Sequence, residues 1–120
     1  MRLFIAREAL DVHLKVADLE RAIAFYTGVL GMRLLRRNDY PEGKFTLAFV
    51  GYDSEDKAAV IELTYNYGVD RYELGSAFGH IAIGVPDVAA TCAAVRDIMQ
   101  TRGYRKIVKS KTMVSEEIEL

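Results

Sequence analysis

DLERAIAFYTGVLG, residues 18–31, is the stretch of this chain from which its fold is predicted. Its apolar residues recur at helical spacing, so we predict an amphipathic helix of about three turns. Asp18 is the predicted N-cap and Gly31 the predicted end of this helix. The predicted apolar face consists of Leu19, Ile23, Tyr26 and Leu30.

A second stretch, DVAATCAAVRDIMQTRG at residues 87–103, has the same pattern. Asp87 follows Pro86 and is the predicted N-cap, and Gly103 is the predicted end. The predicted apolar face consists of Val88, Cys92, Val95 and Met99. Each of these four residues, and the cap, lies 69 positions after its counterpart in the first stretch. The chain therefore contains a predicted internal repeat.

Short strand-like segments accompany both helices. Those before the helices are 12–16 and 80–85, and those after the first helix are 32–36, 45–50 and 58–65, with turns at 38–43 and 51–57. Only seventeen residues follow Gly103, enough for strands at 104–108 and 112–120. We predict one α+β domain over 1–120, made of two βαβββ-type modules at 10–66 and 79–120. The second module is shortened and follows a connector at 66–79.

The composition excludes several classes of partner. The 120 residues include 16 Lys and Arg against 17 Asp and Glu, a net charge of -1, so we expect neither a nucleic-acid partner nor an anionic membrane. No apolar run approaches the roughly 20 residues of a transmembrane helix, and no signal peptide is recognisable, which predicts a cytoplasmic protein. The single Cys92 forms no intrachain disulfide, and its place on the apolar helix face predicts a buried small side chain.

Two side chains stand out in strand-like surroundings. Glu62 is the only charge in 58–64, so it is either solvent-exposed or bound to a ligand. Strand alternation places it on one face with Val60 and Thr64. His80 opens the second module directly after Gly79 and is either a metal ligand or a hydrogen-bonded core residue.

The repeat points to further candidates. The tripeptide Ile-Glu-Leu occurs at 61–63 and again at 118–120, so Glu119 is the counterpart of Glu62 in kind, or else a solvated terminal charge. The residue 69 positions before His80 is Asp11. Asp11 and His13 share one face of an extended strand, so either could reach a common site.

Several segments together resemble the glyoxalase I family, the lactoylglutathione lyases of the vicinal oxygen chelate superfamily. The resemblance covers residues from about 10 to 97, and its main segments are 16–26, 29–32, 45–52, 60–66 and 79–82. The combination of Glu-Leu-Thr-Tyr-Asn at 62–66 with Gly-His-Ile-Ala at 79–82 is specific to this family.

The resemblance implies a cupped sheet of two βαβββ modules around a divalent metal, Ni²⁺ or Zn²⁺, at a homodimer interface. It assigns Glu62 and His80 as metal ligands, and Glu119 as the match for the ligand on the last strand. The family's first ligand, His or Gln, falls on Asp11, and His13 is the alternative. Carboxylate and imidazole both bind these metals.

The resemblance also implies a substrate, the hemithioacetal of methylglyoxal and glutathione, which is isomerised to S-lactoylglutathione in methylglyoxal detoxification. Asn66 matches a position that contacts glutathione. Lys15 stands where the family has an Arg for a glutathione carboxylate, which keeps the charge but loses the bidentate fork. Glu119, or Glu62 in its place, would move the substrate proton.

The C-terminal part departs from the family beyond about Arg96. Asp11 and Glu62 are 51 positions apart, whereas His80 and Glu119 are only 39 apart. One alternative is a catalytically inactive glyoxalase-fold binding module or a truncated paralogue. A further alternative is that 97–120 forms an altered tail on an otherwise ordinary enzyme sequence, which would make the chain dependent on pairing.

Overall fold

A computed structural model describes residues 2–4, 11–73, 75–76, 81–103, 107–109 and 116–118. At 2–4, 11, 107–109 and 116–118 it describes the backbone alone. The chain divides into two compact units, Met1–Gly84 and Val85–Leu120. Each unit is described separately below.

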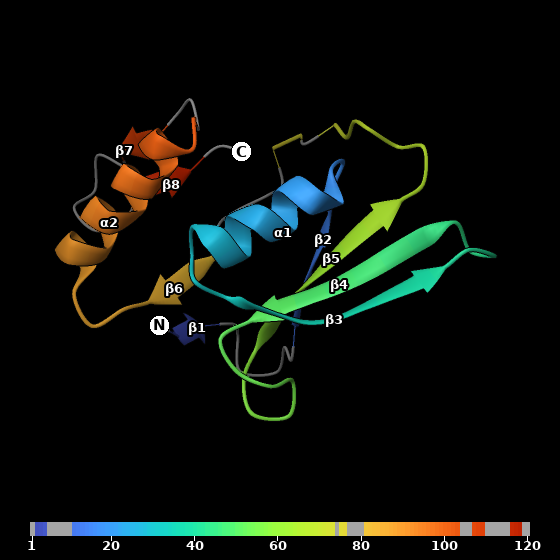
Figure 1. Cartoon of the computed structure of the whole chain (residues 1–120), viewed down its shortest axis with the longest axis horizontal. Helices are drawn as coiled ribbons and strands as arrows, with labels where there is room; N and C mark the ends of the chain where they lie inside the picture. Colours follow the sequence, from blue (N-terminus) through green and yellow to red (C-terminus); the bar gives the residue numbers. More distant parts are fainter. Residues whose placement is uncertain are drawn as a thin grey trace. The chain divides into compact units, whose positions relative to one another are not determined.

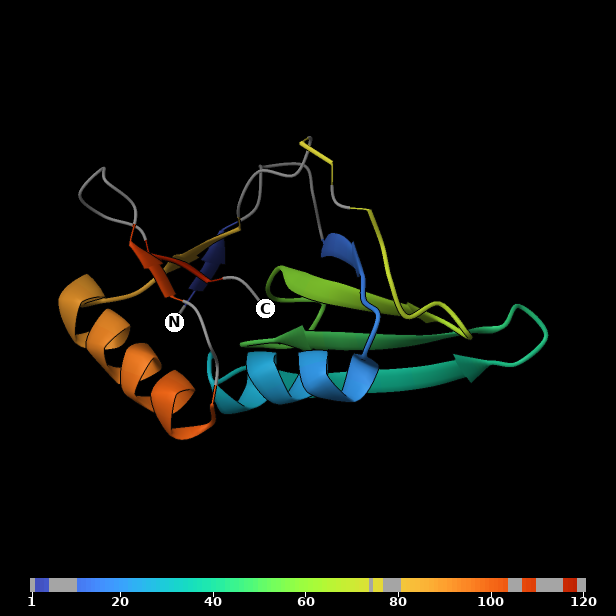
Figure 2. The same cartoon turned by 90° about the horizontal axis from the view of Figure 1, so that it is seen from above.

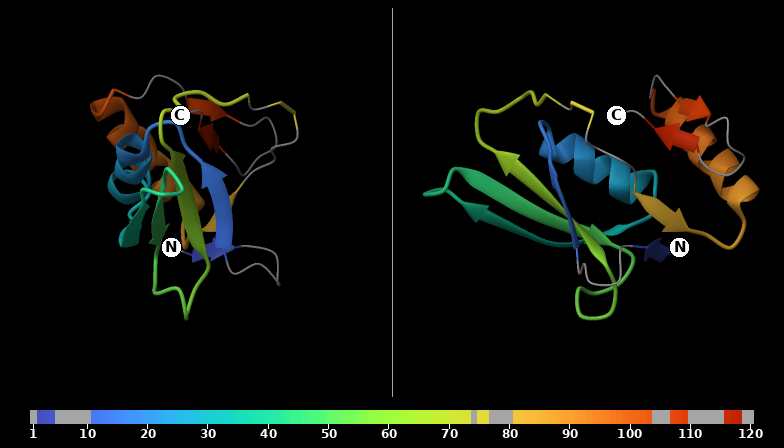
Figure 3. Two further views of the ribbon diagram at one scale, coloured as in Figure 1. Left: turned by 90° about the vertical axis from the view of Figure 1, so that its right-hand side faces the viewer. Right: turned by 180° about the vertical axis from the view of Figure 1, so that it is seen from behind.

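The first unit contains a four-stranded sheet and one described helix (Figure 1). In chain order the elements are β2 (Asp11–Lys15), α1 (Leu19–Gly28), β3 (Arg33–Tyr40), β4 (Phe45–Gly51) and β5 (Val60–Asn66). The strand order is β2-β5-β4-β3, with β2 parallel to β5 and the other neighbours antiparallel. This arrangement confirms the predicted βαβββ module, and Figure 3 shows β2 and β3 at opposite edges. Strands β1 (Arg2–Phe4) and β6 (Ala82–Gly84) form a separate antiparallel pair.

Helix α1 begins as predicted. The Asp18 side chain accepts a hydrogen bond from the backbone N–H of Arg21 at 3.0 Å, which satisfies one of the free donors of the first turn. The helix ends at Gly28, before the predicted Gly31. Leu19 and Tyr26 are buried, as the apolar spacing predicts.

The core of this unit lies between α1 and one face of the sheet (Figure 2). From the helix it includes Leu19, Ala22, Phe25 and Tyr26, and from the strands it includes Ala48, Val50, Ile61 and Leu63. We call this the helix face of the sheet. The burial of Ile61 and Leu63 follows from strand alternation, because both point away from Glu62.

Strand β3 is longer than predicted, because it runs to Tyr40 through residues assigned to a turn. Its side chains are almost all exposed, so no buried apolar pattern marks the strand. Long polar side chains instead contact neighbouring elements, and Arg37, for example, forms an ion pair with Glu20 of α1. A bulge at Leu35 shifts the register, so that Leu34 pairs with Val50 but Arg36 pairs with Phe49.

The second unit contains α2 (Val88–Thr101) and the antiparallel pair of β7 (Ile107–Lys109) and β8 (Glu116–Ile118). Asp87 caps α2 as predicted, accepting from the N–H of Ala90 at 3.0 Å. The predicted apolar face is only partly buried: Met99 is fully buried, Cys92 is half-buried, and Val88 is 42% exposed. Neither α1 nor α2, the two described helices, has the length and apolar content to cross a membrane.

Candidate metal and substrate site

The sheet face opposite α1 carries the candidate site. Within the described part of the first unit no helix lies on this face, and we call it the helix-free face. One row of paired residues crosses it from edge to edge, in the order Arg36, Phe49, Glu62 and His13. The next row contains Leu47, Thr64 and Lys15. The predicted carboxylate and the nearby histidine are thus direct neighbours across β5 and β2.

Glu62 and His13 are brought together by the parallel register of these two strands. His13 Nε2 lies 4.0 Å from Glu62 Oε1 and 2.6 Å from Thr64 Oγ1, where it forms a hydrogen bond. The Glu62 side chain is 18% exposed and that of His13 is 52% exposed. An imidazole nitrogen and a carboxylate oxygen therefore converge at the β2 edge of the face, where solvent reaches the imidazole.

A cation, Arg36, lies at the other end of this row. The Arg36 guanidinium carbon lies 3.7 Å from the centre of the Phe49 ring, and its Nε donates to Glu55 Oε1 at 2.8 Å. Phe49 is only 5% exposed. Glu55 therefore holds Arg36 over the aromatic ring, and Glu62 lies between this apolar surface and the imidazole.

Asn66, the predicted glutathione contact, ends β5 on the same face. Its Nδ2 donates to the hydroxyl of Tyr72 at 3.0 Å. The chain reverses between them in a turn in which the N–H of Val69 donates to the carbonyl of Asn66 at 3.1 Å. Gly68 has a φ of +80°, which a glycine adopts without strain.

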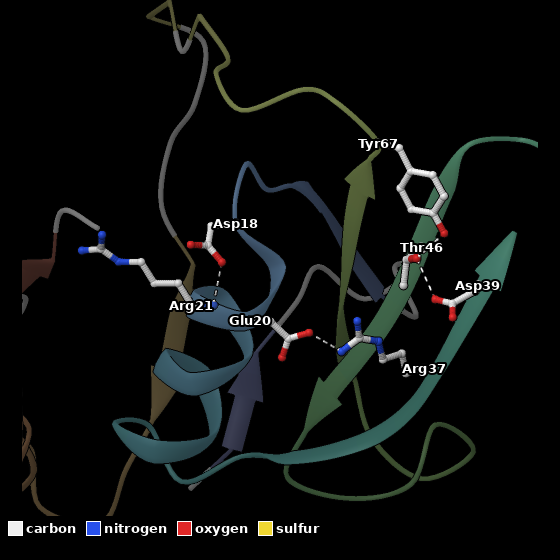
Figure 4. A network of polar contacts seen from close by, with 7 residues as sticks. All are labelled: Asp18, Glu20, Arg21, Arg37, Asp39, Thr46 and Tyr67. Carbon is white, nitrogen blue, oxygen red and sulfur yellow. Dashed lines mark hydrogen bonds and ion pairs between the residues drawn. The ribbon is translucent and has the colours of Figure 1, made fainter. Parts of the chain in front are cut away.

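A polar network on the helix face fixes the same end of the sheet (Figure 4). The buried Thr46 donates to Asp39 Oδ1 at 2.7 Å and also shares a 2.8 Å hydrogen bond with the Tyr67 hydroxyl. The N–H of Tyr67 donates to the carbonyl of Lys44, which continues the β4–β5 ladder by one step beyond Asn66. The residue after Asn66 is therefore tied to Lys44 and Thr46, and Thr46 is in turn tied to Asp39 of β3.

The structure describes some of the predicted site residues and not others. Glu62 and His13 are adjacent, and Lys15 is exposed in register with Thr64. Asp11 pairs with Val60 through the backbone, and its side chain lies outside the described residues. His80 and Glu119 also lie outside them. Among the side chains that are described, no group of three or more metal-binding types is assembled.

Several contacts of the site were not predicted from the sequence. Alternation placed Thr64 on the face of Glu62, which was a usable signal for its contact with His13. Arg36 reaches Phe49 only because of the bulge, which leaves no clear mark in the sequence. Tyr72 meets Asn66 through a turn, for which the only signal was Gly68.

The sequence is similar to curated lactoylglutathione lyases. It is 62% identical over 89 residues to the lactoylglutathione lyase of Haemophilus influenzae, covering 74% of this chain and 66% of that protein. It is 56% identical over 88 residues to the probable lactoylglutathione lyase of Synechocystis, covering 73% and 67%. The match to the Escherichia coli O157:H7 lactoylglutathione lyase is 59% over 87 residues, covering 72% and 64%. The chain thus spans about two thirds of the length of these relatives.

The chain is also similar to solved structures of glyoxalase I. Glyoxalase I of Leishmania major, described as trypanothione-dependent, matches with a TM-score of 0.76 and 45% identity over 88% of this chain and 73% of its own. Glyoxalase I of Zea mays matches with a TM-score of 0.73 and 43% identity over 89% of this chain and 39% of its own. The model of the Glyoxalase/Bleomycin resistance protein/Dioxygenase superfamily matches residues 10–99. The chain belongs to this superfamily and, within it, to the glyoxalase I family.

Proposed function

We propose that this chain is a metal-dependent lactoylglutathione lyase that isomerises the hemithioacetal of methylglyoxal and glutathione to S-lactoylglutathione. The relatives at 56–62% identity carry that name. The observation that carries the proposal is the position of Glu62. Its carboxylate is the only charge in β5 and lies beside His13 on the helix-free face, not in a solvated turn.

The donor chemistry of this pair fits a divalent metal. Imidazole nitrogen and carboxylate oxygen are common ligands of Ni²⁺ and Zn²⁺, with bonds of about 2.0–2.2 Å for Zn²⁺. The 4.0 Å between His13 Nε2 and Glu62 Oε1 is within reach of one ion. We propose Glu62, His80 and Glu119 as ligands, with Asp11 or His13 as the ligand from β2. The metal would act as a Lewis acid that stabilises negative charge on the two adjacent oxygens of the substrate.

The chain's own groups have separate tasks in this proposal. Glu119, or Glu62 in its place, removes the proton from one substrate carbon and returns it to the next. Lys15 and Asn66 hold the tripeptide of the substrate by charge and by hydrogen bonds. Phe49, covered by Arg36, gives the row next to Glu62 an apolar surface, which strengthens electrostatic interactions at the carboxylate.

We further propose that the chain works as a homodimer in the cytoplasm. Two copies would complete the site across their interface, as the family resemblance implies. The cytoplasm keeps glutathione and protein thiols reduced, which the thiol substrate requires. Sedimentation of the purified chain should show a dimer, and a monomer active at full rate would refute the shared site.

Turnover by the metal-stripped chain tests the proposed activity. We expect S-lactoylglutathione to form only after Ni²⁺ or Zn²⁺ is added. Titration calorimetry with either metal gives a readout independent of turnover, and we expect binding to be lost in Glu62→Gln. Comparing His13→Ala with Asp11→Ala then identifies the ligand from β2. An absence of both turnover and metal binding would favour the inactive binding module.

A further inference from the structure

We infer that Tyr72 is a positioning residue for the thiol substrate, because its hydroxyl holds the side chain of Asn66 in place on the helix-free face. The inference rests on the proposed function, in which Asn66 binds the tripeptide. A side chain that is already held in one rotamer loses less conformational entropy when it binds a ligand. A binding amide therefore benefits from a partner that holds its side chain before the ligand arrives.

Tyr72 is such a partner. Its hydroxyl accepts from Asn66 Nδ2 at 3.0 Å, and both side chains are half-buried. With Nδ2 engaged in this bond, Asn66 presents its Oδ1 and its second N–H to a ligand. Tyr72 keeps its own O–H as a further donor beside them. Among the residues that the structure describes, Tyr72 is the one hydrogen-bond partner of the Asn66 amide.

The backbone holds Tyr72 in this place. Asn66 and Val69 close a turn through a 3.1 Å hydrogen bond, and Gly68 supplies the positive φ that the turn needs. Tyr67, inside the same turn, is tied to Thr46 on the helix face. The connector is thus anchored at Tyr67, five residues before Tyr72. This anchor limits the conformational entropy that is lost when the Tyr72 hydroxyl binds the Asn66 amide.

The ligand chemistry that suits this pair is the amino-acid end of a thiol peptide. An ammonium group donates to Asn66 Oδ1, and a carboxylate accepts from the amide N–H or from the Tyr72 O–H. Lys15, exposed and paired with Thr64 two residues before Asn66, adds a positive charge on the same face. The three groups together complement a zwitterion and provide no comparable partner for a simple alkyl thiol.

The test uses the metal-loaded chain of 120 residues and S-methylglutathione, an unreactive thioether, as the probe. In Tyr72→Phe we expect the Kd for the probe and the KM for the hemithioacetal to rise about 3- to 10-fold, with kcat changed less than about twofold. Tyr65→Phe is the matched control, because it removes a tyrosine hydroxyl from the helix face of β5 and leaves both Asn66 and the Tyr67–Thr46 hydrogen bond in place. Its Kd should equal that of the wild type.

A double-mutant cycle with Asn66→Ala separates positioning from a merely structural role. We expect Tyr72→Phe to add no further loss once Asn66 is alanine, and the melting temperatures of all variants to show that they fold. Additive losses, or an unchanged Kd in Tyr72→Phe, would overturn the inference even if turnover is normal. Probe binding with coupling but without turnover would support the inference and refute the proposed lyase. A wild type that does not bind the probe would refute both.

Discussion

The two faces of the four-stranded sheet differ in what their side chains contact. On the helix face, Ile61 and Leu63 are fully buried beneath α1. On the helix-free face, the alternate residues of the same strand begin with the buried Val60 and continue with Glu62, Thr64 and Asn66. Each of the last three faces a polar partner in β2 or in the connector. From Ile61 to Asn66, this strand thus supplies the core beneath α1 from one face and the candidate site from the other.

This division means that stability and chemistry depend on adjacent residues that can be changed separately. Each face also has its own means of fixing polar groups. The helix face has a side-chain network around Thr46, whereas the helix-free face has the contacts of His13 with Glu62 and Thr64 and the pair of Asn66 with Tyr72. We therefore expect substitutions on the helix face of β5 to lower mainly stability, and substitutions on its helix-free face to lower mainly activity.

The largest expected effect is the loss of activity in Glu62→Gln. The amide keeps the shape of the side chain but removes the charge that binds the metal and could move the proton, so we expect turnover to fall at least about 100-fold. Stability should change by less than about 1 kcal/mol, because the side chain is not part of the core. Steady-state kinetics and urea denaturation measure the two effects. An unfolded Glu62→Gln variant would contradict the separation of the faces.

The next effect is on stability and concerns the residue that follows Glu62. Leu63→Ala removes a fully buried side chain beneath α1 and leaves a cavity, so we expect a loss of about 2–5 kcal/mol in the free energy of unfolding. Leu47→Ala is the matched control, since Leu47 is a half-buried leucine on the helix-free face. It should cost only about 1 kcal/mol. Equal losses in the two variants would show that both faces are equally packed.

Much of this comparison was predictable from the sequence. The N-caps, the βαβββ order and the alternation around Glu62 depend on local spacing, and local spacing is preserved when the chain folds. The prediction of strand ends failed at β3, where contacts with distant residues, and not burial of apolar side chains, accompany the strand. Strand β3 extends to Tyr40 because Arg36, Arg37 and Asp39 find partners in other elements, and no pattern within the strand records those partners.

The candidate site was predictable to a similar degree. Family motifs single out Glu62 and Asn66, but the contact of His13 with Thr64 required the register of β2 against β5. That register is a property of the folded sheet, since a slip of two residues would preserve every face while changing every neighbour. The partner of Asn66 depends in turn on a single turn at Gly68.

The smallest expected effect is a loss of stability at alkaline pH, and it concerns Tyr52. The Tyr52 hydroxyl donates to the backbone carbonyl of Leu30 at 2.6 Å, and burial raises the pKa of Tyr52 to about 12 from an ordinary value of 10.0. Between these two pH values the unfolded chain loses the tyrosine proton while the folded chain keeps it. The free energy of unfolding should therefore fall as pH rises from about 10 to about 12.

Urea denaturation at a series of pH values tests this expectation. Tyr52→Phe removes the titrating group, so its stability should fall less steeply than that of the wild type over the same pH window. Burial also raises the pKa of Tyr26, so the Tyr26→Phe/Tyr52→Phe variant should be flatter still. Glu62→Gln should keep the full wild-type slope, because it alters only the helix-free face. If the free energy of unfolding of the double variant still fell steeply with pH, the alkaline loss of stability would come from other groups. The two faces could then not be distinguished by their dependence on pH.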